Sequence, residues 1–177
     1  DEPYILVRFV AFNASHDIGI KVMSDEEKIA LVDRLSKYGR VYISSEGPVP
    51  DELKDKLLKT PYHLIHHVLA FAQLVFSEGA TIASEAAVLG VHALYVNTIQ
   101  SGSTREQSER YGLLYCFHDP DERFRQAADK AVELLETPHL VEMGQAKRRK
   151  LLEEKVDING YFMQEMERLV KVGRKGK

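Results

Sequence analysis

Short apolar runs of strand type alternate with helix-type segments over most of this chain, and this alternation restricts the possible folds more than any other feature. The runs predict six strands: Tyr4–Val10, Arg40–Ser44, His63–Val68, Leu74–Ser77, Ala93–Val96 and Leu113–Phe117. Helices between them give successive strand–helix–strand units, which place parallel strands in one sheet with helices on both faces. The sequence therefore predicts an α/β fold with a doubly wound, Rossmann-like parallel sheet.

Capping residues mark where the longer helices are expected to start. Ser24 is predicted to be an N-cap, and Glu27 occupies the position that completes a capping box. Asp119 and Pro120 predict a second start, as the N-cap and first residue of a helix that runs to about residue 136. Shorter helices are predicted over residues 51–58 and 105–110.

The size and composition are those of an ordinary globular chain. Its 177 residues allow one domain with an appendage, so we expect a Rossmann-like domain over residues 1–138 and a helical extension over 139–177. The single cysteine, Cys116, excludes an internal disulfide framework and favours a cytoplasmic location; it is expected to be a core residue. No apolar run has the length of a membrane span. Because the chain starts at Asp1 rather than Met, we expect that a further domain precedes it.

The helical extension combines a cationic cluster with an amphipathic stripe. The cluster, Lys147–Lys150, is expected to be a solvated helix face. The stripe consists of Ile158, Tyr161, Phe162, Met166, Leu169 and Val170. It needs a partner, which is this domain's sheet, a second domain or another chain, so an oligomer is possible. The net charge of −3 and the lack of aromatic residues among the cations argue against nucleic-acid binding.

The stretch from Ser77 to Asn97 is the strongest candidate for a binding site. It consists of a strand end, a small-residue turn, a helix with Ser84 and Glu85 in its second turn, and a further strand. The first amides of a helix have no acceptor inside it and the helix dipole favours negative charge there, so such a turn can bind an anion. A carboxylate one turn further could reach ribose hydroxyls. The alternative is an ordinary crossover with small residues for tight packing.

Loops that follow other strands add candidates, because ligands of such sheets lie beyond the carboxyl ends of the strands. In the first loop, His16 lies beside Asn13 and Ser15, and could contact a phosphate or carry a proton; it is our only candidate for catalysis. Glu106 and Gln107 could bind a sugar, although residues that merely open a helix would look the same. The seven histidines form no recognisable metal-binding pattern, so no metal is expected.

The segment E-G-A-T-x-x-S-E-A-A-x-L-G, residues 78–90, resembles the nucleotide-sugar motif of the GT-B superfamily, which includes UDP-GlcNAc 2-epimerases and the N-acetylglucosaminyltransferase of peptidoglycan synthesis. Five pieces resemble the uncharacterised DUF354 family more closely: RFVAFNASHDIG, VYISSEG, IHHVLAFAQLVFSEGATIASEAAVLG, ALYVN and YGLLYCFHDPDE. The resemblance covers roughly residues 4–155 and corresponds to the C-terminal half of a GT-B fold. It implies that an N-terminal domain lies outside this chain.

The resemblance also implies residue roles. Glu85 matches the carboxylate that holds the ribose of UDP, with Ser84 beside it in the motif. The diphosphate would be held by Gly79, Ala80 and Thr81, and on the opposite side by Asn13, Ser15 and His16. The uracil would contact backbone groups near His67 and Val68, and the sugar would lie near Glu106 and Gln107.

From the resemblance we expect the donor-binding half of a glycosyltransferase that takes a nucleotide sugar, a UDP-sugar, as its substrate, with no further cofactor. The alternatives are an enzyme like the UDP-sugar 2-epimerases and a non-catalytic interaction domain that has kept the fold. In every case the expected partner is the N-terminal domain of the same polypeptide, and the isolated chain is expected to be inactive.

Overall fold

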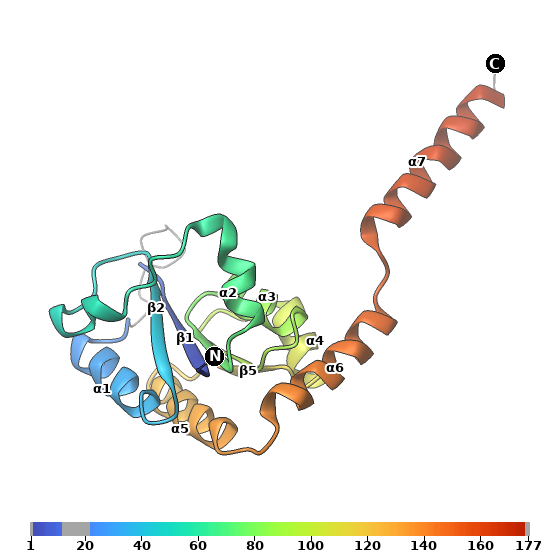
Figure 1. The fold of residues 1–177 in the computed structure, drawn as a ribbon. Coiled ribbons are helices and arrows are strands. Elements are labelled where there is room, and N and C mark those ends of the chain that lie inside the picture. Colours follow the sequence, from blue (N-terminus) through green and yellow to red (C-terminus); the bar gives the residue numbers. More distant parts are fainter. Residues whose placement is uncertain (1, 12–21, 176–177) are drawn as a thin grey trace.

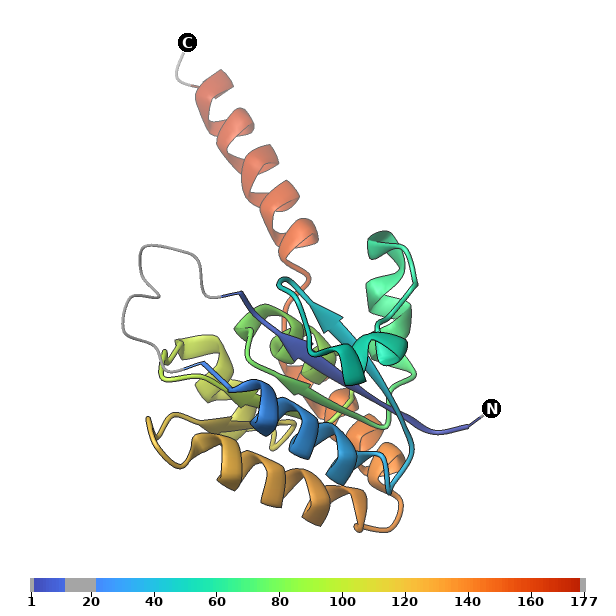
Figure 2. The ribbon, with the colours of Figure 1, turned by 90° about the vertical axis from the view of Figure 1, so that its left-hand side faces the viewer.

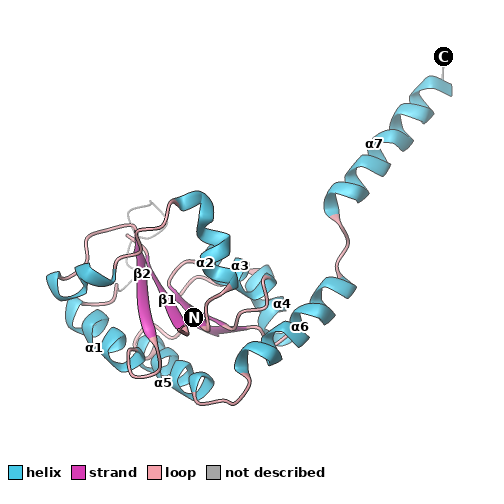
Figure 3. Cartoon of the chain, viewed as in Figure 1, coloured by secondary structure: helices cyan, strands magenta, loops and turns pink. Residues whose placement is uncertain are grey.

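The computed structural model describes residues 2–11 and 22–175, and its centre is a five-stranded parallel sheet (Figures 1 and 3). The strands lie in the order β2-β1-β3-β4-β5, and every neighbouring pair is parallel. They are β1 (Tyr4–Phe9), β2 (Arg40–Ser45), β3 (Leu74–Ser77), β4 (Ala93–Val96) and β5 (Leu114–Phe117). The predicted α/β fold with a doubly wound parallel sheet is therefore confirmed.

Two long helices cover one face of the sheet, and α2 (Ile65–Ala70) and α3 (Ala80–Val88) cover the other (Figure 2). On the first face, α1 (Asp25–Leu35) and α5 (Arg123–Leu135) pack on Ile5, Val7 and Phe76. On the second face, α2 and α3 lie over Leu6 and Val75, and α4 (Gly102–Glu109) packs beside α3 on β5. The strand order reverses between β1 and β3, so their carboxyl ends form the point at which ligands of such sheets bind.

The predicted strand His63–Val68 is wrong, because the structure places a short 3-10 helix, η3 (Tyr62–Leu64), and then α2 there. The apolar residues Ile65, Val68 and Leu69 follow a spacing of three and four, which puts them on one helix face, while His66 and His67 point to solvent. A short apolar run cannot be assigned from its length alone, and here the helical period decides. A second 3-10 helix, η2 (Asp51–Lys56), replaces the short helix predicted after Pro50.

The helix starts were predicted with unequal success. Ser24 and Glu27 form the expected capping box: Ser24 Oγ accepts from the Glu27 amide at 3.2 Å, and Glu27 Oε2 accepts from the Ser24 amide at 2.8 Å. Asp119, in contrast, is not the N-cap of α5. Its Oδ1 accepts from the amides of Asp121 and Glu122 and holds a turn, and the regular helix begins at Arg123.

Helix α6 (Leu140–Glu154) is anchored to the domain by side chains that reach the last carbonyl of α3 and a carbonyl of the turn that follows α4. Lys147 Nζ donates to the Gly112 carbonyl oxygen at 2.7 Å, and Arg148 Nε donates to that of Val88 at 3.0 Å. The expectation that Lys147–Lys150 is simply a solvated face is therefore wrong for these two cations. Arg148 neutralises the negative end of the α3 dipole, and Lys147 fixes the turn that follows α4.

Helix α7 (Ile158–Lys175) extends away from the sheet and its covering helices (Figures 1 and 2). Its apolar residues are exposed: Ile158, Tyr161, Phe162, Met163, Met166, Leu169 and Val170. The amphipathic helix predicted at the end of the chain is thus present, and its apolar face is not covered by the described part of the domain. None of the described helices is both long and apolar enough to cross a bilayer.

Candidate functional site

The N-terminus of α3 lies at the carboxyl edge of the sheet, where the sequence predicts an anion site. Gly79 is the N-cap; Ser77 Oγ accepts from its amide at 3.1 Å and donates to its carbonyl oxygen at 2.8 Å. Ala80 and Thr81 then open the helix, in positions whose amides have no acceptor within the helix. Their amides keep the geometry of an anion site, whereas the Gly79 amide already has an acceptor.

Glu85 lies further along α3, beside α2. Its Oε2 atom is 3.4 Å from His66 Nε2, and 36% of its side chain is exposed. A carboxylate has about four acceptor positions, so this one contact leaves room for ribose hydroxyls. Ser84, the preceding residue, is half-buried, and its carbonyl oxygen accepts from Gln107 Nε2 at 3.4 Å.

His67 and Val68 lie on α2 rather than on the predicted strand. His67 is exposed, and the Val68 carbonyl oxygen accepts a 2.5 Å hydrogen bond from the hydroxyl of Tyr4. One of the backbone groups predicted to contact the uracil, the Val68 carbonyl, therefore already has a donor, and the predicted contact itself stays a prediction. Two neighbouring cavities share the segment 57–60: one of about 560 Å³ beside Tyr4 and Tyr42, and one of about 380 Å³ at the carboxyl end of β2. The second lies at the ligand edge and has the size of a small-molecule pocket.

Glu106 and Gln107 lie on α4 and face structural partners. Both carboxylate oxygens of Glu106 are 2.7 Å from Lys155 Nζ, in the segment that joins α6 to α7. Gln107 is 8% exposed, and besides its bond to Ser84 its Oε1 atom is buried with no hydrogen-bond partner in the described structure. The structure thus brings Gln107 to α3 but turns Glu106 toward the helical extension.

The predicted residues of the first loop cannot be compared with the structure. Asn13, Ser15 and His16 lie outside the described residues. Their proposed contacts with a phosphate, and the catalytic role considered for His16, stay predictions.

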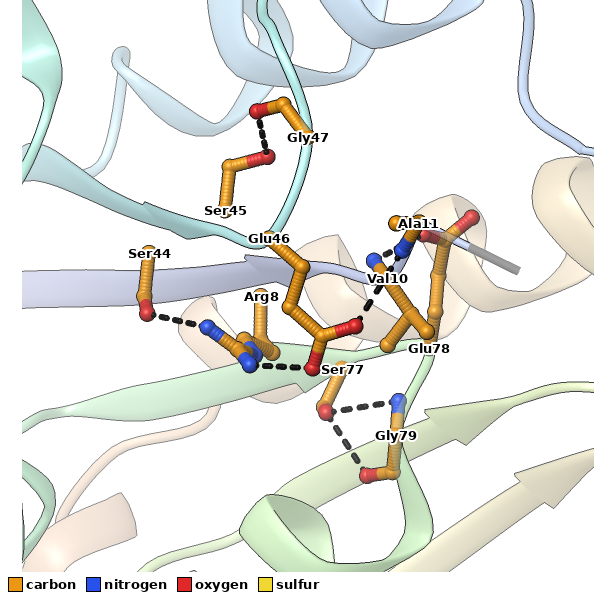
Figure 4. A network of polar contacts seen from close by, with 10 residues as sticks. All are labelled: Arg8, Val10, Ala11, Ser44, Ser45, Glu46, Gly47, Ser77, Glu78 and Gly79. Atoms are coloured by element: carbon orange, nitrogen blue, oxygen red, sulfur yellow. Dashed lines mark hydrogen bonds and ion pairs between the residues drawn. The ribbon is translucent and has the colours of Figure 1, made fainter. Parts of the chain in front are cut away.

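Two charged groups at the same edge were missed by the sequence analysis (Figure 4). Arg8, near the end of β1, donates to Ser44 Oγ at 2.8 Å and to Glu46 Oε1 at 2.5 Å. Glu46 Oε2 in turn accepts from the Ala11 amide at 3.3 Å. The sequence did contain a feature that singles out Arg8, since it is the one charged residue of the apolar run Tyr4–Val10. A cation in a central strand needs a partner or a function.

Glu78 is the second group that was missed, although it lies inside the predicted motif. Its side chain is 2% exposed, Oε2 accepts from the Val10 amide at 2.9 Å, and Oε1 is buried with no hydrogen-bond partner among the described residues. Burial raises the pKa of this carboxyl to about 7, although the Val10 hydrogen bond and the charges of Lys28 and Arg123 act in the opposite direction. Glu78 therefore changes charge near neutral pH.

The histidines of the described residues do not form a metal centre, because no group of three potential His, Cys, Asp or Glu ligands occurs there. His92 is buried at the far end of β4, where its Nδ1 atom is 3.2 Å from the hydroxyl oxygen of Tyr115. Burial lowers the pKa of His92 to about 4, and the charges of Lys147 and Lys130 act in the same direction. The ring is neutral in the folded protein and belongs to the core.

Solved structures with the same fold include glycosyltransferases and a protein assigned as an epimerase. The spinosyn forosaminyltransferase SpnP matches 96% of this chain with a TM-score of 0.59 at 17% identity, and the calicheamicin glycosyltransferase CalG4 matches 86% with a TM-score of 0.54 at 22% identity. A protein assigned as the UDP-N-acetylglucosamine 2-epimerase of Listeria monocytogenes matches 93% with a TM-score of 0.53 at 16% identity. At these identities the likeness concerns the fold, which is Rossmann-like and of the GT-B type.

The match covers only part of each of these proteins. The chain spans 44% of SpnP, 38% of CalG4 and 46% of the epimerase, which is less than half of each. No family model and no curated protein matches the chain.

Proposed function

We propose that this chain is the donor-binding half of a GT-B glycosyltransferase of the DUF354 type, and that its substrate is a UDP-sugar. One observation carries the proposal. The N-terminus of α3, with Ala80 and Thr81 in its first turn, lies at the carboxyl edge where the strand order reverses, and Glu85 follows on the same helix. This arrangement fits a diphosphate followed by a ribose.

Each part of the ligand then has a place on the sheet edge. The amides of Ala80 and Thr81 and the helix dipole stabilise the diphosphate, both when it binds and when it leaves with the negative charge of the broken glycosidic bond. Glu85 accepts hydrogen bonds from the ribose. The cavity at the end of β2, beside Ser45 and Tyr62, takes the base, since the Val68 carbonyl is bound to Tyr4.

The acceptor and the group that activates it belong to a second domain in this proposal. The chain spans less than half of the glycosyltransferases that share its fold, and its α7 carries an exposed apolar face. We therefore expect the isolated chain to bind UDP and to transfer no sugar. Epimerisation is the second candidate, because an assigned 2-epimerase shares the fold to a similar degree. Product analysis of a preparation that contains both domains, given UDP-GlcNAc without an acceptor, separates the two reactions.

Titration with UDP tests the binding site directly. We expect chemical-shift changes in residues 77–85, and a Glu85→Gln variant that loses about 1–3 kcal/mol of binding because a charge-assisted hydrogen bond is removed. Glu106→Gln is the matched control, since that carboxylate lies on α4 and is paired with Lys155. If saturating UDP shifts no resonance in residues 77–85, the proposal is wrong and the interaction-domain alternative is favoured.

A further inference from the structure

Arg8 is placed on the same face and the same edge of the sheet as the start of α3. Strand residues alternate in direction, and Leu6 of β1 packs with Ala83 and Ala86 of α3, so Arg8 also points to the α3 side. In the sheet register Arg8 lies opposite Ser44 on β2 and Ser77 on β3. Both neighbours are small side chains, so the guanidinium of Arg8 is the one long polar group across these three adjacent register positions.

The connection from Arg8 to the anion site is short. Ser77, its register partner, bonds both the amide and the carbonyl of Gly79, the N-cap of α3. Figure 4 shows Arg8, Ser77 and Gly79 together where these strands end. A diphosphate at the first turn of α3 would therefore lie between a helix N-terminus and a fixed cation.

The contacts of Arg8 hold the guanidinium in place but leave it replaceable on one side. Ser44 Oγ fixes one terminal nitrogen at 2.8 Å, and Glu46 Oε1 holds the other at 2.5 Å. The side chain of Arg8 is 17% exposed whereas that of Glu46 is 43% exposed, so the carboxylate lies on the solvent side of the pair. Partly exposed ion pairs contribute little net stability, and a diphosphate offers the same guanidinium nitrogen an anionic oxygen with more charge behind it.

We propose that Arg8 binds the diphosphate of the nucleotide, and that Glu46 occupies its guanidinium when no ligand is bound. This inference rests on the proposed function, because it deepens the description of the same site. Glu46 then acts as a competitor as well as a support: its charge weakens anion binding, while its hydrogen bond to the Ala11 amide keeps it at the site after displacement.

The two residues should therefore respond in opposite directions when UDP and inorganic pyrophosphate are titrated by calorimetry against the full chain. Arg8→Gln is expected to weaken binding of both by roughly tenfold or more, because a charge-assisted contact is lost. Glu46→Gln is expected to tighten binding of both by about two- to fivefold, since the competing charge is gone. The double variant should match Arg8→Gln alone.

Two further variants separate the effect of the guanidinium of Arg8 from that of a positive charge alone and from that of any exposed arginine. Arg8→Lys keeps the charge without the planar fork and should give an intermediate loss. Arg125→Gln is the matched control and should leave binding unchanged, because that exposed arginine on α5 pairs with Asp129 on the same helix and with Glu122 just before it. Melting temperatures of all variants show whether each one is folded at the titration temperature.

The result also separates this inference from the proposed function. Glu85→Gln should affect UDP only, since pyrophosphate has no ribose, whereas Arg8→Gln should affect both ligands. Binding of UDP that depends on Glu85 but not on Arg8 would overturn the inference alone. A Glu46→Gln variant that weakens binding as much as Arg8→Gln would overturn it as well, because the pair would then be purely structural. If neither ligand binds the unmodified chain, both proposals fail.

Discussion

The backbone amide of Val10 donates a 2.9 Å hydrogen bond to Oε2 of Glu78, and this bond joins the end of β1 to the end of β3 at the switch point of the sheet. The acceptor is a carboxyl group with 2% exposure and a pKa raised to about 7 by burial. Its usual pKa is 4.5. The strand ends next to the candidate site are therefore held by a group that titrates near neutrality.

Glu78→Gln should change how stability depends on pH. The raised pKa means that the folded state holds the proton more tightly than the unfolded chain, so stability is fully present below pH 4.5 and falls as the pH rises through about 7. Over the whole shift of the pKa, the stability lost corresponds to about 3 kcal/mol. Glutamine keeps an oxygen for the Val10 amide and cannot ionise. The free energy of unfolding in urea should therefore fall less in the variant than in the wild type as the pH rises from 4.5 to 7.

The control for Glu78→Gln is Glu106→Gln, which removes a half-exposed carboxylate that is paired with Lys155. It leaves Glu78 in place, so the fall in stability that Glu78 causes as the pH rises through about 7 should remain. Parallel curves for Glu78→Gln and the wild type would show that Glu78 is ionised in the folded state and that burial does not raise its pKa.

His92→Asn should act with the opposite sign. The pKa of His92 is lowered from 6.5 to about 4, so the unfolded chain binds the proton first and stability is lost as the pH falls through this range. Asparagine places a polar atom near the position of Nδ1, which lies beside Tyr115, and removes the titration. We expect the free energy of unfolding in urea to fall less in the variant than in the wild type as the pH drops from 6.5 to 4, whatever the absolute stability. If the variant and the wild type lose stability equally over this pH range, the pKa of His92 is not lowered in the folded protein.

Gly144→Ala should destabilise the protein by about 1–3 kcal/mol, the usual cost of overpacking. A Cβ atom at residue 144 would overlap the carbonyl oxygen of Gly90, so α6 would have to move away from α3. Gly102→Ala is the matched control, because no atom lies within 4 Å of a Cβ there and alanine favours the helix. Equal melting temperatures for both variants would contradict the close contact of α6 with the Gly90 turn.

Phe162→Ser should cost less than about 0.5 kcal/mol of unfolding free energy, as for surface positions in general. Phe162 is 60% exposed on α7, whereas Leu94 in the core is 0% exposed. Leu94→Ala, the comparison variant, should cost about 2–5 kcal/mol. If Phe162→Ser is as costly as Leu94→Ala, the α7 face is covered in solution, and gel filtration with light scattering would then show whether a second copy covers it.

The strands were predictable because each is a short apolar run, and the two central runs that follow the first strand, β3 and β4, are buried at every residue. Leu74–Ser77 and Ala93–Val96 agree with the structure residue for residue. The run His63–Val68 failed because its apolar residues fit a helical stripe as well as a strand, and the two histidines between them are exposed on α2. The spacing of three and four from Ile65 to Val68 and Leu69, which pack in one cluster, distinguishes the two.

The turn at Gly79 could be located from sequence because its parts are neighbours along the chain. The pairs Arg8–Ser44 and Val10–Glu78 could not, since they join residues separated by 36 and 68 positions and depend on the register of three strands. The same reason explains Lys147 and Arg148. Their charge suggested solvent, and only the docking of α6 shows that they bind the carbonyl oxygens of Gly112 and Val88.

The contact between Gly90 and Gly144 has an evolutionary consequence. Gly90 has a φ of +84°, a conformation that favours glycine, and its carbonyl oxygen fills the place where any other residue at 144 would put its Cβ. Neither position can drift alone. A lineage that replaces one of them must also tilt α6, and with it the base from which α7 extends, so these two glycines are expected to be kept or exchanged as a pair.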